Sequence, residues 1–158
     1  MANTIEVTVR RQFAESPERV FGAWLDENTV RSWMSMPFAA LGGRPVDVRR
    51  IEIDPRVGGR FTFSDMREDG EAVHWGTYLE IDRPRKLVFT WFTSEEDEQA
   101  NNSVVTLIIE PDSDGCVATI VHAMDAKWAA YIKQTEQGWS GMLGNIGRRL
   151  RMRLARSR

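Results

Sequence analysis

Short segments between residues 48 and 124 alternate polar and apolar side chains, and this alternation constrains the fold more than any other feature. In "GGRFTFSDMR", Phe61 and Phe63 fall on one face of a strand and polar side chains on the other. Turn signals such as "EDG" and "PDSDG" separate segments of this kind. The connections are too short for parallel strands, which need crossovers of a dozen or more residues. The region therefore predicts an antiparallel sheet, in which "SEEDEQANN" is a polar hairpin loop.

The N-terminal part adds a strand and two short helices to this sheet. "TIEVTVRRQF" alternates strictly and brings the expected number of strands to about seven. Ser16 before Pro17 is typical of a helix start, and a second helix is expected from Asn28. The segment 35–47, with two prolines and a Gly-Gly pair, predicts a long loop.

The last 30 residues return to helical periodicity. Taking Trp139 as the reference at about 100° per residue, one apolar stripe is predicted. It consists of Trp128, Ile132, Met142, Leu143, Ile146, Leu150 and Leu154. The segment also holds a glycine at every third position, from Gly138 and Gly141 to Gly144 and Gly147. Because each glycine weakens a helix by roughly 1 kcal/mol, we expect this helix to be stabilised by docking its stripe on the sheet. Gly138 and Gly147 border the stripe, and the other two fall on the back.

The order strand, two helices, six strands, helix predicts an α+β fold and one domain over residues 1–158. The net charge of −2 gives no indication of a nucleic-acid partner. One cysteine, Cys116, cannot form an internal disulfide, which fits a reducing compartment. With neither a signal-peptide run nor an apolar stretch of about 20 residues, the expected location is the cytoplasm, without a membrane partner.

Several motifs, in this order, carry a resemblance to a known family: "ESPERVFGAWLDENTVRSWM", "DPRVGGRFTF", "GTYLEIDRPRKLVFTW", "TIVHAM" and "EQGWSGML". With the order of elements, they resemble the START-like (SRPBCC, helix-grip) superfamily. The most similar branch is homologous to the C-terminal domain of the activator of the heat-shock-protein-90 ATPase. The resemblance implies a curved seven-stranded sheet wrapped around the C-terminal helix, with a cavity between them. The superfamily includes lipid carriers, hormone receptors, polyketide cyclases and co-chaperone domains.

From the predicted inward faces of the strands and the helix, we assign residues to the lining of the cavity that the resemblance implies. Trp33 and Phe38 are expected at its entrance. The remaining lining residues are Phe61, Phe63, Leu79, Phe89, Trp91, Leu107, Ile120 and His122 from the sheet and Trp139, Met142, Leu143 and Ile146 from the helix. Tryptophan and phenylalanine walls suit a planar ligand, and the alternative is that the same side chains fill the core.

Catalytic candidates are few. Asp65 shares the inward face of its strand with Phe63, and His122 ends an apolar strand, so this carboxylate and imidazole are candidates for general acid/base work. The alternative is a satisfied polar pair at the end of the sheet. His74, His122 and Cys116 lack the spacing of a metal-ligand pair, so neither a metal nor a cofactor is expected.

These features lead to three functional hypotheses. The first is binding of a small hydrophobic or aromatic ligand, in a stress-related role and without catalysis, with loop 35–47 as a gate. The second is a cyclase, dehydratase or hydrolase that uses Asp65 and His122. The third is an interaction module that stimulates a chaperone or forms a homodimer, in which the acidic run from Glu95 to Glu98 pairs with C-terminal arginines of a second copy. A direct chaperone role is not expected, because the eukaryotic activator docks its chaperone through a separate N-terminal domain.

Overall fold

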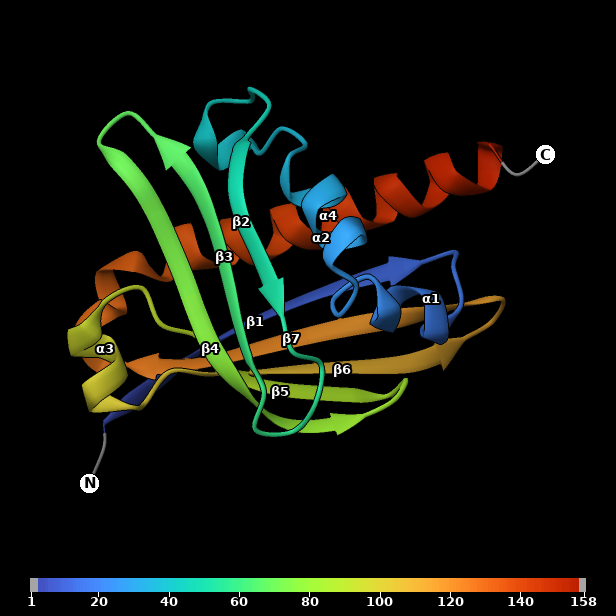
Figure 1. Cartoon of the computed structure of the whole chain (residues 1–158). Coiled ribbons are helices and arrows are strands. Elements are labelled where there is room, and N and C mark those ends of the chain that lie inside the picture. The colour runs from blue at the N-terminus through green and yellow to red at the C-terminus, as the bar shows by residue number, and fades with distance from the viewer. Residues whose placement is uncertain (1–2, 157–158) are drawn as a thin grey trace.

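The computed structural model, which describes residues 3–156, joins seven strands into one antiparallel sheet (Figure 1). Their order across the sheet is β1-β7-β6-β5-β4-β3-β2. The bounds are Thr4–Phe13 (β1), Asp47–Ile53 (β2), Arg60–Arg67 (β3), Gly70–Asp82 (β4), Lys86–Thr90 (β5), Val104–Asp112 (β6) and Gly115–Asp125 (β7). In Figure 1 the strands β2 to β4 rise steeply from the other four, and the long C-terminal helix crosses the curved sheet. The predicted α+β helix-grip architecture is confirmed.

Two short helices follow the first strand, as predicted. Helix α1 (Pro17–Gly22) begins after Ser16, whose hydroxyl oxygen accepts from the backbone N–H of Arg19. Helix α2 (Glu27–Met34) begins one residue before the predicted start, because the carboxylate of Asp26 caps it. The following loop contains a short 3-10 helix, η1 (Ala39–Leu41).

The predicted hairpin loop "SEEDEQANN" is wrong: six of its residues form helix α3 (Glu95–Ala100). Ser94 caps its first turn by accepting from the N–H of Asp97, and acidic side chains are favourable at the positive end of a helix dipole. Glu96 and Glu98 pair within the chain, with Lys127 at 3.5 Å and with Arg60 at 3.3 Å. Part of the acidic run is therefore already engaged by this chain's own cations.

The sheet bends sharply within β4, and the bend changes which side chains point inward. The pairing of β4 with β5 slips between Tyr78 and Glu80, which places a bulge at Leu79. Next to it, a Cβ at Gly76 would lie 1.9 Å from the carbonyl oxygen of Thr90, so only glycine fits there. Tyr78 is consequently buried and Leu79 is 47% exposed. The predicted inward orientation of Leu79 is wrong, because a bulge shifts the alternation by one residue.

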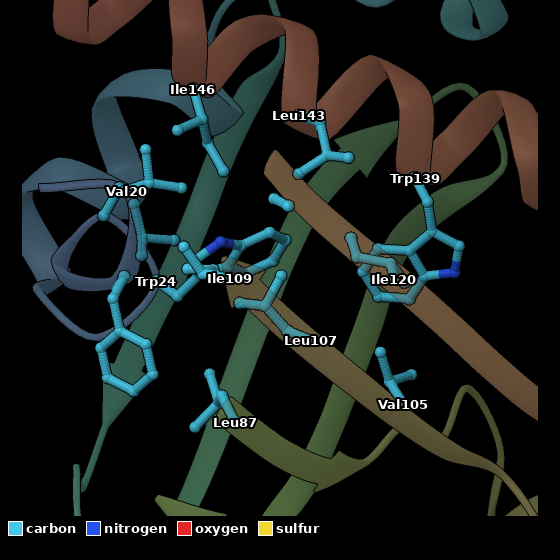
Figure 2. Packing of buried hydrophobic residues seen from close by; sticks show 14 of the residues in the cluster. Val20, Trp24, Leu87, Val105, Leu107, Ile109, Ile120, Trp139, Leu143 and Ile146 are labelled. Carbon is cyan, nitrogen blue, oxygen red and sulfur yellow. The ribbon is translucent and has the colours of Figure 1, made fainter. Parts of the chain in front are cut away.

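Helix α4 (Ile132–Arg156) docks its apolar stripe on the sheet, preceded by a 3-10 helix, η2 (Ala126–Tyr131). Figure 2 shows Trp139, Leu143 and Ile146 of α4 pointing toward the side chains of β6 and β7. All three are buried, as is Leu150. The side chain of Leu154, the last member of the predicted stripe, lies outside the described residues, as do the side chains of the last C-terminal arginines.

The glycines of α4 let other side chains approach the helix. A Cβ at Gly141 would lie 2.9 Å from Cδ1 of Phe38, so the loop after α2 covers part of the predicted back of the helix. Gly147 is buried against Phe13, and the guanidinium of Arg11 lies near Gly144 and Gly147. A close approach of neighbouring groups thus accounts for Gly141 and Gly147.

Candidate functional site

A cavity of about 460 Å³ lies between the sheet, the first half of α4 and the loop that contains η1. Ligand cavities in proteins span about 300–1,000 Å³, so this one has room for a small molecule. Its lining comprises Met34, Phe38, Leu41, Val46, Asp65, Arg67, His74, Trp91, Thr93, Asp97, Asn102, Ser103, His122, Met124, Asp125, Trp128, Tyr131, Gln134, Thr135, Gln137, Gly138, Trp139 and Met142.

Aromatic rings form the walls. The Trp91 and Trp139 ring centroids are 5.0 Å apart, and the His74 ring stacks on Trp91 at 4.9 Å with 21° between the planes. Near the start of α4, Trp128 and Tyr131 make an edge-on pair at 5.6 Å. Such walls offer large, stiff apolar faces to a planar ligand.

His122 is held by hydrogen bonds at both of its ring nitrogens. Its Nδ1 accepts from the indole N–H of Trp139 at 3.1 Å, and its Nε2 lies 2.8 Å from the hydroxyl oxygen of Ser103. Burial lowers the pKa of His122 to about 4, so the ring is neutral near pH 7. The imidazole is a fixed, neutral part of the wall.

A second polar group, on β3 and β4, faces the same cavity. The buried carboxylate of Asp65 accepts from Nε of Arg67 at 2.8 Å, which gives it a counter-charge. His74 lies on the neighbouring strand, and burial, followed by the positive charge of Arg67, lowers its pKa to about 4. Its Nδ1 is buried and has no hydrogen-bond partner within residues 3–156.

The two catalytic candidates therefore line one cavity, but each is bonded to other groups. Asp65 is paired with Arg67, and His122 with Ser103 and Trp139. No hydrogen bond joins Asp65 to His122 in the described part of the chain. The arrangement fits two satisfied polar groups in an apolar wall.

The other predicted lining residues divide between the cavity and the packed core. Phe38, Trp91, His122, Trp139 and Met142 line the cavity. Phe61, Phe63 and Phe89 surround a separate void of about 10 Å³, which has room for one water molecule at most. Packed in the core are Trp33, Leu107, Ile120, Leu143 and Ile146. Trp33, expected at the entrance, is fully buried, and its indole N–H donates to the carbonyl of Ala23 at 2.9 Å.

Several lining residues were not predicted from the sequence. His74 and Tyr78 lie an even number of positions apart and therefore share one face of β4. The bulge at Leu79 interrupts the alternation, so the sequence pattern did not indicate that this face points inward. Ser103 directly follows the predicted loop "SEEDEQANN" and opens the predicted strand segment "SVVTLIIE", whereas in the structure it lies between α3 and β6. Trp128 was placed on the helical stripe, but it belongs to η2 and lines the cavity from there.

Other kinds of site find little support in the structure. Among residues 3–156, no three His, Cys, Asp or Glu side chains come together as a set of metal ligands. Cys116 is buried at the start of β7, and burial, followed by the charge of Glu15, raises its thiol pKa to about 11. Within the same described range, no helix is both long and apolar enough to span a bilayer.

Solved structures with the same architecture come from several bacteria. A Staphylococcus aureus protein of unknown function is 16% identical, with a TM-score of 0.80 and 98% of each chain covered. An AHSA1-like protein from Aeromonas hydrophila is 21% identical, with a TM-score of 0.71, over 94% of this chain and 93% of that one. The Aha1 dimer of Colwellia psychrerythraea is 11% identical, with a TM-score of 0.70, over 90% of this chain and 93% of that one. These likenesses establish the fold.

No curated protein sequence matches the chain. The family model described as "Activator of Hsp90 ATPase homolog 1-like protein", in contrast, matches residues 14–151. That range includes both walls of the cavity and six of the seven strands, β2 to β7. The chain therefore belongs to the family of Activator of Hsp90 ATPase homolog 1-like proteins, within the START-like fold superfamily.

Proposed function

We propose that this protein binds a small, largely apolar aromatic molecule in the cavity between the sheet and α4. The observation that carries the proposal is the cavity itself: about 460 Å³ of space walled by Trp91, Trp139, Trp128 and Tyr131. Side chains that filled this space would increase the free energy of unfolding, since an unfilled apolar cavity lacks packing contacts. Both histidines of the lining are neutral near pH 7, so neither adds a positive charge to the wall.

The expected affinity follows from the area that such a ligand buries. Burying roughly 300 Å² of apolar ligand surface contributes about 7 kcal/mol at 25 cal/mol per Å². The loss of translational and rotational freedom offsets part of this free energy. Because about 7 kcal/mol alone corresponds to a dissociation constant of roughly 10 µM, values of about 10 to 1,000 µM are expected for compounds with two fused rings.

Isothermal titration with 2-ethylnaphthalene tests the proposal. Gly138 lines the cavity, and a Cβ there meets no atom within 4 Å, so Gly138→Leu adds side-chain atoms at the cavity wall. Gly144→Leu is the control, because Gly144 lies on the same helix but outside the lining. We expect micromolar binding by the wild type and by Gly144→Leu, and at least tenfold weaker binding by Gly138→Leu. If the wild type does not bind, or if Gly138→Leu binds equally well, the proposal is wrong.

A further inference from the structure

The hydrogen bonds of His122 fix the position of one proton at the cavity wall. An indole N–H can only donate, so Nδ1 of His122 must accept from Trp139. In a neutral imidazole the other nitrogen then carries the proton, so Nε2–H donates to the hydroxyl oxygen of Ser103 at 2.8 Å. The direction of both hydrogen bonds follows from the indole alone.

Ser103 accepts in this bond and still has its own hydroxyl proton to donate. Within residues 3–156, no group accepts that proton, although Ser103 lines the cavity. The backbone of Ser103 is held in place, because its carbonyl accepts from the N–H of Trp91 at 3.2 Å. A fixed oxygen with one unused donor therefore faces the space between the aromatic walls.

The other two aliphatic hydroxyls around the cavity, and the amide of Asn102, have acceptors within the chain. The hydroxyl of Thr93 donates to Asp97, and that of Thr135 donates to the carbonyl of Tyr131. Nδ2 of Asn102 donates to Asp125 at 2.9 Å. Of the three aliphatic hydroxyls in the described lining, Ser103 alone keeps a free proton.

We propose that Ser103 selects the ligand by donating a hydrogen bond to it, so that the preferred ligand is an aromatic molecule bearing a carbonyl-type acceptor oxygen. This inference rests on the proposed function, because it needs a ligand in the same cavity. His122 and Trp139 act as positioning residues: they orient the Ser103 hydroxyl but do not contact the acceptor oxygen of the ligand. A hydrocarbon leaves the donor unpaired, and an amine presents a donor where an acceptor is needed.

A matched pair of probes tests the selectivity. The compounds 2-acetylnaphthalene and 2-ethylnaphthalene have nearly the same shape and differ in the carbonyl oxygen. We define the preference as the ratio of their association constants, measured by isothermal titration. One hydrogen bond changes binding by about 3- to 10-fold, so we expect this preference to fall by about that factor in Ser103→Ala. Ser103→Thr retains a hydroxyl and is expected to restore it.

The outcomes separate the two proposals. If neither probe binds the wild type, the proposed function fails and this inference fails with it. If both probes bind and Ser103→Ala leaves the preference unchanged, only this inference is overturned. Nitrogen-15 NMR of His122 supplies an independent measurement: we expect the proton on Nε2, and a proton on Nδ1 would contradict the inference.

Discussion

At the scale of single residues, the two buried histidines set how stability depends on pH. The pKa values of His74 and His122 fall from 6.5 to about 4 on folding. The unfolded chain therefore binds more protons than the folded chain between these values, and the unfolding free energy decreases as the pH falls through this window. For the buried ring of His122, the loss is on the order of 3 kcal/mol between pH 7 and pH 4.

Urea unfolding at pH 7, 6, 5 and 4.5 measures this dependence. The variant His122→Gln keeps a hydrogen-bonding side chain but does not titrate. Its stability is expected to change about half as steeply with pH as that of the wild type, because His74 remains. A wild type whose stability is constant over this range would contradict the prediction, as would a variant with the unaltered slope.

At the scale of elements, two glycines of α4 differ in how much space surrounds them, so we expect replacing each by alanine to change stability differently. A Cβ at Gly144 has its nearest neighbour at 3.8 Å, whereas one at Gly141 would lie 2.9 Å from Phe38. We expect Gly144→Ala to stabilise the protein by about 0.4–1 kcal/mol through helix propensity. Gly141→Ala is expected to gain less or to destabilise, because Phe38 must shift. Thermal unfolding of both variants measures the difference, and equal gains would show that Phe38 does not restrict this position.

Elements with a long, regular period were predictable from the sequence, and elements that depend on distant partners were not. The strands follow from alternation or from apolar runs between turn signals, and α4 follows from its helical stripe. The outward orientation of Leu79 has no local signal in the sequence, because it depends on the register of β4 against β5, which slips between Tyr78 and Glu80. Helix α3 combines a local cap at Ser94 with ion pairs to Arg60 and Lys127.

The candidate site shows the same division. The alternation and the helical stripe identified Trp91, Trp139 and His122 as inward-facing side chains, and all three line the cavity. The free donor of Ser103 has no signal in the sequence. It depends on a chain of hydrogen bonds from α4 through β7 to the segment before β6.

At the scale of the whole molecule, the sheet and α4 depend on each other for stability. Trp139, Leu143, Ile146 and Leu150 are each at most 4% exposed, and they complete the core over the sheet. Burying such side chains contributes about 1.5–3 kcal/mol each, and therefore about 6–12 kcal/mol for the four. The free energy of unfolding of a domain is typically about 5–15 kcal/mol. Without α4, the sheet should have little or no net stability.

Truncation after Asp125 removes η2 and α4 and is expected to abolish cooperative thermal unfolding. Truncation after Met152 is the matched control, because it retains Leu150 and the buried positions before it. The control is expected to keep a midpoint within a few degrees of that of the full chain, since the four buried side chains that α4 docks on the sheet are all retained. A cooperative transition in the chain that ends at Asp125 would mean that the sheet has a core of its own. The docked helix would then be an accessory to the fold, and the cavity beneath it a gap between two independent parts.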